Sequence, residues 1–113
     1  MSRWMQIRVH IDPVYKKSFA KEFPKLYRVV TGLDNSLIEA NPTFMDLVPL
    51  IVRLSQEKSL EPGLSKAIEH YGPKIVDLHR QISEAVGGWK LSQAETLLYE
   101  LEDQFVAFEK ELG

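Results

Sequence analysis

The residues best suited to acid–base chemistry are His79 and Glu102. An imidazole beside a carboxylate can take up and release a proton near neutral pH. However, no third group is available in the sequence to orient the histidine. We therefore interpret the two residues as a hydrogen-bonded pair at the edge of a helical hairpin, and we predict a protein that is not an enzyme.

Glu69, His70, Asp77 and His79 are of types that bind metal ions. Neighbouring residues on a helix point about 100° apart, and no two histidines have the i, i+4 spacing of a zinc-binding helix. The chain has no cysteine, which excludes disulfides and thiolate metal sites. The sequence predicts no metal site and no cofactor.

Charge is unevenly distributed along the chain. Residues 1–30 hold seven basic and two acidic residues, whereas residues 91–113 hold one basic and six acidic residues. Such polarity can create a surface for a partner, or it can draw the two ends of one fold together. The second explanation needs no partner and is preferred. The alternative is RNA or ribosome binding by the basic first 30 residues, in which aromatic side chains alternate with cations.

We predict a non-catalytic protein-interaction module, such as an adaptor, a small chaperone or a regulator, whose partner is another protein or a second copy. Opposite charges would steer the partner, which would then cover an apolar groove beside the helix at 43–57. A strand at 5–11 could extend the edge of a partner's sheet. The candidate interaction residues are Trp4, Arg8, Lys17, Lys21, Phe23 and Arg28.

Composition indicates one folded domain spanning residues 1–113. Of its 113 residues, 44% are hydrophobic and 27% charged, as in ordinary globular proteins. The first residues lack the long apolar stretch of a secretory signal. The most apolar segment, FMDLVPLIVRL, is interrupted by Asp46 and Pro49 and predicts a buried helix rather than a membrane span. We expect a cytoplasmic protein that does not enter the membrane.

The first half of the chain predicts short elements. Alternation of apolar and polar residues predicts a strand at 5–11, and the Asp12-Pro13 pair predicts a helix from there to Phe23 that Pro24 ends or kinks. Residues 25–40 fit either a strand or a helix. Thr43 and Asp46 have the spacing of a capping box, which opens the central helix at 43–57.

The second half predicts an antiparallel helical hairpin over 64–112, turning at Gly87-Gly88. Apolar residues recur at steps of three and four in two ladders, which are Leu64, Ile68, Tyr71, Ile75, Leu78, Ile82, Ala85 and Trp89, and Leu91, Ala94, Leu98, Leu101, Phe105, Phe108 and Leu112. One register joins them, with Ile82 opposite Leu98.

The flanks of the last ladder decide what that helix packs against. Glu95, Glu102 and Glu109 all lie beside it, so pairing with a second copy would bring no attractive charges together. Ser92 and Glu95 predict a capping box at the start of the second hairpin helix. The predicted fold is mainly α with a minor β part, in which the hairpin packs against the central helix and an N-terminal strand-helix unit.

Overall fold

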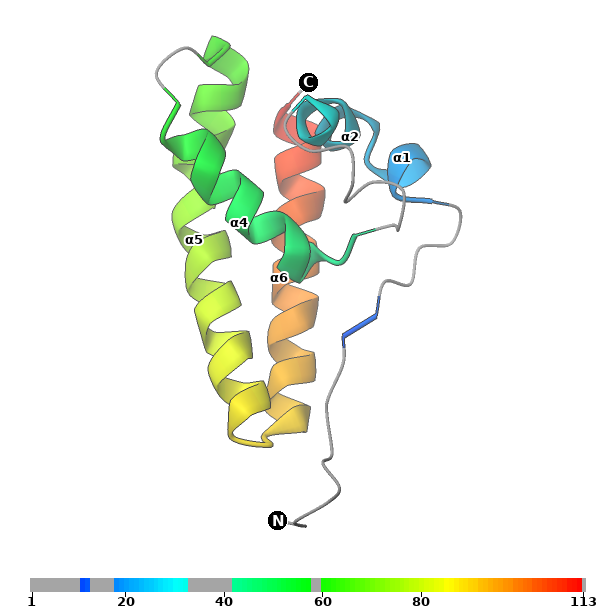
Figure 1. Ribbon diagram of the computed structural model, residues 1–113, viewed down its shortest axis with the longest axis vertical. Coiled ribbons are helices and arrows are strands. Elements are labelled where there is room, and N and C mark those ends of the chain that lie inside the picture. Colours follow the sequence, from blue (N-terminus) through cyan, green and yellow to red (C-terminus); the bar gives the residue numbers. More distant parts are fainter. Residues whose placement is uncertain (1–10, 13–17, 33–41, 58–59, 113) are drawn as a thin grey trace.

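The computed structural model describes residues 11–12, 18–32, 42–57 and 60–112, and these residues form helices and no strand. The helices are α1 (Phe19–Glu22), α2 (Pro24–Thr31), α4 (Phe44–Ser55), α5 (Pro62–Gly87) and α6 (Leu91–Glu111). Helices α5 and α6 lie side by side and antiparallel, α4 crosses them, and α2 lies beside the C-terminal end of α6 (Figure 1). The prediction of a mainly α fold with a C-terminal hairpin is confirmed.

The two predicted ladders form most of the hairpin core. Ile75, Leu78 and Ile82 of α5 are fully buried, as are Leu101 and Phe105 of α6. The second ladder differs near the turn, where Leu97 is buried and Leu98 only half-buried. Leu91, which the ladder also includes, is 46% exposed.

The hairpin turn follows the Schellman pattern of helix termination. The N–H of Lys90 donates to the carbonyl of Ala85 at 2.8 Å, and that of Trp89 donates to the carbonyl of Val86 at 3.1 Å. The residue with left-handed backbone is Trp89, at φ 60, where glycine is usual. Trp89 is 56% exposed, so it does not close the core.

The start of α6 also corrects the sequence analysis. Because α6 begins at Leu91, its N-cap is Lys90 and no side chain caps it. Ser92 therefore lies inside the helix, and the predicted capping box is wrong. The turn itself lies at Gly87-Gly88 as expected, since α5 ends at Gly87 and Gly88 is its C-cap.

The helix predicted from Pro13 to Phe23 is interrupted at Ser18, which has extended backbone with φ −164. Its hydroxyl accepts a hydrogen bond from the N–H of Lys21 and so begins α1 there. Pro24 ends α1 as predicted, and it also opens α2, where its missing N–H is no loss. Residues 24–31 are helical, so a strand is excluded for 25–31. Residues 5–10 and 33–40 lie outside the described part, and the strand at 5–11 stays a prediction.

Helix α4 joins the N-terminal helices to the hairpin. Its capping box between Thr43 and Asp46 is present as predicted. Phe44 stacks on Phe105 of α6 at a ring distance of 4.7 Å and meets Phe23 edge-on at 5.3 Å. Phe23 in turn stacks on Phe19 at 5.9 Å. Each such pair contributes about 0.5–1.5 kcal/mol beyond its burial, so this aromatic chain fixes α1 and α2 on the hairpin.

Candidate functional site

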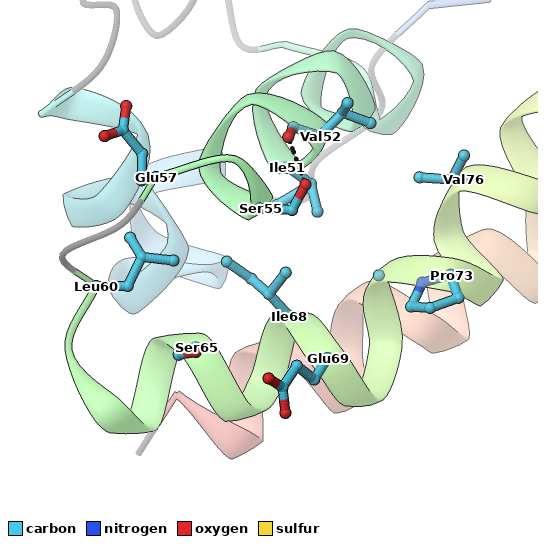
Figure 2. Close-up of a pocket in the computed structure, with 11 residues that line it drawn as sticks. Ile51, Val52, Ser55, Glu57, Leu60, Ser65, Ile68, Glu69, Pro73 and Val76 are labelled. Atoms are coloured by element: carbon cyan, nitrogen blue, oxygen red, sulfur yellow. Dashed lines mark hydrogen bonds between the residues drawn. The ribbon is translucent and has the colours of Figure 1, made fainter.

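A groove of about 450 Å³ lies between α4 and the first half of α5. Figure 2 shows Ile68 pointing from α5 towards Ile51 and Ser55 of α4, with Leu60 at one end of the space and Pro73 and Val76 at the other. The described residues that line it are Ile51, Val52, Ser55, Glu57, Leu60, Ser65, Ile68, Glu69, Gly72, Pro73 and Val76.

Apart from Ile68, the lining residues lie outside the two hairpin ladders. Ile51 and Ile68 are buried and form the inner wall, whereas Val52 is half-buried and Val76 is 41% exposed. Gly72 has no side chain, so between Ile68 and Val76 the backbone of α5 itself lines part of the groove. The groove is therefore largely apolar and open to solvent on the Val76 side.

The polar groups of the groove are few. The hydroxyl of Ser55 donates to the carbonyl of Val52 at 2.6 Å and is satisfied within α4. The carboxylates of Glu57 and Glu69 are exposed and lie at the outer edge (Figure 2). Pro73 has no N–H, so it donates no hydrogen bond to the carbonyl of Glu69 one turn before it. Apolar contact, rather than convergent polar groups, is what this groove offers a ligand.

The sequence analysis expected an apolar groove beside the helix at 43–57, but it did not identify the residues of α5 that form the other wall. Gly72 and Pro73 lie within the first hairpin helix, and α5 continues through them from Pro62 to Gly87. The available signal was Val76, an apolar residue outside the α5 ladder. Val76 is exposed and lines the groove, so an apolar residue outside the ladder indicated an apolar surface on α5.

The two chain ends meet, as the charge distribution favours, but through a contact whose form the sequence did not predict. Glu109 of α6 accepts hydrogen bonds from the backbone N–H groups of Lys25 at 2.8 Å and Leu26 at 2.9 Å. These are free N–H groups of the first turn of α2, whose N-cap Phe23 has no capping side chain. The basic and acidic ends therefore meet through a carboxylate and a helix N-terminus. No ion pair joins residues 18–30 to 91–112 in the described structure.

The free ends of the hairpin helices share a small polar cluster. The Nδ1 atom of His70 lies 3.0 Å from a carboxylate oxygen of Glu111. Burial and the hydrogen bond with Glu111 raise the pKa of Tyr71 above its ordinary value. Both contacts tie α5 to α6 far from the turn and indicate a structural role.

The predicted pair of His79 and Glu102 forms no hydrogen bond or ion pair in the part of the chain that the structure describes. Burial, and then the charge of Asp103, raise the pKa of Glu102 above its ordinary value. Glu102 thus lies beside another acid, and no described cation pairs with it.

The predicted interaction residues are not gathered in one described place. Trp4, Arg8 and Lys17 lie outside the described residues. Lys21 and Arg28 are exposed, whereas Phe23 is only 8% exposed and belongs to the core.

The RNA-binding hypothesis needs aromatic rings exposed beside the cations. Among the described residues of the basic segment, Phe19 and Phe23 are buried and Tyr27 is half-buried. The described part of that segment supplies cations without an exposed aromatic side chain, and RNA binding stays a prediction.

The described residues include no cluster of three or more acidic or histidine side chains arranged to hold a metal ion. None of the described helices is long and apolar enough to cross a membrane. Comparisons of the chain with protein-family models, curated proteins and solved structures found no match.

Proposed function

We propose that this protein is a non-catalytic interaction module whose groove between α4 and α5 receives an apolar segment of a protein partner. The observation that supports the proposal is the groove of about 450 Å³, walled by Ile51, Ile68 and Val76. Its volume lies within the range of ligand-binding clefts, roughly 300–1,000 Å³.

The chemistry of the walls favours apolar side chains of a protein over a small polar ligand. Small-molecule sites orient their ligand with a few convergent polar groups. Here the Ser55 hydroxyl is already bonded to the carbonyl of Val52, and the acids lie at the edge. A segment laid between two helices, with its side chains in an apolar groove, is an established mode of peptide recognition.

Peptides from a random library, selected on the full-length protein, test the proposal through Val76→Asn. Asparagine is close to valine in size and in helix propensity but removes the apolar surface. Fully burying a valine side chain is worth about 1.5–3 kcal/mol. Because Val76 is 41% exposed, the peptide can cover somewhat less than half of it, and Val76→Asn should weaken peptide affinity about three- to eightfold. Affinity is measured by isothermal titration calorimetry.

Val106→Asn is the matched control. Val106 lies on α6, is 43% exposed against 41% for Val76, and does not line the groove. It should leave affinity unchanged. If no peptide is selected, or if both variants bind selected peptides as the wild type does, the groove is not the binding site and the proposal is wrong.

A further inference from the structure

Among the described residues that line the groove, the charged ones are all of one sign. The two ionisable lining residues, Glu57 and Glu69, are both acids on opposite sides of the space, one after α4 and one on α5. No lysine, arginine or histidine is among the lining residues that the structure describes.

Several other acids of the described structure already have partners. Arg80 pairs with Asp77 at 2.8 Å and with Glu84 at 3.0 Å, and Glu109 caps α2. By contrast, neither Glu57 nor Glu69 has an ion-pair partner among the described residues. The edge acids can therefore take a cation from a partner without breaking an ion pair described within the protein.

The backbone adds an acceptor on the same wall. In an α-helix the N–H of residue 73 would donate to the carbonyl of residue 69, but Pro73 has no N–H. Pro73 and Glu69 both line the groove. The carbonyl of Glu69 therefore receives no hydrogen bond from residue 73, and it belongs to the same wall of the groove as the Glu69 carboxylate.

We propose that the partner segment is apolar and basic, with a lysine or arginine beside the apolar residues that enter the groove. This inference rests on the proposed function, since it names the chemistry of that ligand. The apolar side chains would cover Ile51, Ile68 and Val76, and the cations would reach Glu57 and Glu69. Exposed ion pairs of this kind change affinity about two- to fivefold each, and more weakly at high salt.

The test uses one selected peptide in three versions that differ only in the residues flanking its apolar core, which are lysine, glutamine or glutamate. Affinities are measured on the full-length wild type, on the double variant Glu57→Gln and Glu69→Gln, and on Glu95→Gln with Glu100→Gln. The last variant changes net charge equally, but its acids lie on α6 outside the groove lining. The lysine peptide should bind the wild type about five- to twentyfold more tightly than the glutamine peptide, and the glutamate peptide most weakly.

The preference for lysine should disappear in the Glu57 and Glu69 variant and persist in the control. Equal binding of the three peptides, or equal effects of the two double variants, would overturn the inference. If binding nevertheless remains sensitive to Val76→Asn and not to Val106→Asn, the proposed function stands without it. Insensitivity to Val76→Asn overturns both.

Discussion

Replacing Glu109 with alanine should destabilise the protein by about 2 kcal/mol. The carboxylate accepts two backbone hydrogen bonds at 2.8 and 2.9 Å, from residues 83 and 84 positions away in the sequence. Hydrogen bonds to charged groups contribute about 1.5–3 kcal/mol, and loss of an N-cap costs about 0.5–2 kcal/mol. Water can partly replace the lost acceptor at this half-buried position, which places the expected cost inside these ranges.

Urea unfolding at pH 7 measures the change in the free energy of unfolding, provided that the m value is unchanged. Glu109→Gln keeps one acceptor oxygen and loses the charge, so it should cost about 1 kcal/mol. Glu100→Ala is the control, because Glu100 is an exposed acid on the same helix with no hydrogen bond among the described residues. It should change stability by less than about 0.5 kcal/mol.

Amide exchange locates the effect. The amides of Lys25 and Leu26 should lose protection in Glu109→Ala, while amides in the middle of α5 should follow only the global change. If Glu109→Ala and Glu100→Ala have the same stability, or if these two amides keep their protection, Glu109 does not hold α2 on the hairpin.

Three further predictions concern the hairpin. Trp89→Gly should stabilise the protein by about 0.5–1 kcal/mol in thermal unfolding, because glycine relieves the left-handed backbone; an equal gain for Trp89→Ala would assign the effect to the ring instead. Leu97→Ala should lower the free energy of unfolding by about 2–4 kcal/mol, and Leu98→Ala should lower it clearly less, because Leu97 is buried and Leu98 only half-buried. If urea unfolding shows the larger loss for Leu98→Ala, the observed packing is refuted. Glu102→Gln should raise stability at pH 7, since burial raises the pKa of this acid and so penalises its charged form in the fold. That gain should decline as the pH falls through the raised pKa of the folded protein towards 4.5, the ordinary pKa, and be lost below it; a gain independent of pH would contradict the assignment.

The hairpin could be predicted because its signal is local and repeated. Within each ladder, as at Ile75, Leu78 and Ile82, the apolar residues lie on the same face of their helix. Only one register of the two helices buries both ladders together. The residues near the turn could not be predicted in the same way. A chain with Gly87-Gly88 suggests glycine in the left-handed position, yet the structure places Trp89 there and starts α6 at once.

The hydrogen bonds of Glu109 and the α5 wall of the groove could not be predicted, because both depend on tertiary placement. The only local hint of the first is that α2 has no capping side chain at Phe23. The groove depends on how α4 crosses α5, and this crossing is fixed partly by the contacts of Phe44 with Phe23 and Phe105. Periodicity within one helix contains no information about that angle.

The most direct test of groove binding is to titrate a selected peptide into the ¹⁵N-labelled full-length protein and follow its amide resonances. The account predicts that the largest shifts fall on residues of the groove, among them Val52, Ser55, Ile68 and Val76. Shifts concentrated at Lys21 and Arg28, or around Trp89 at the hairpin turn, with the groove resonances unchanged, would contradict it.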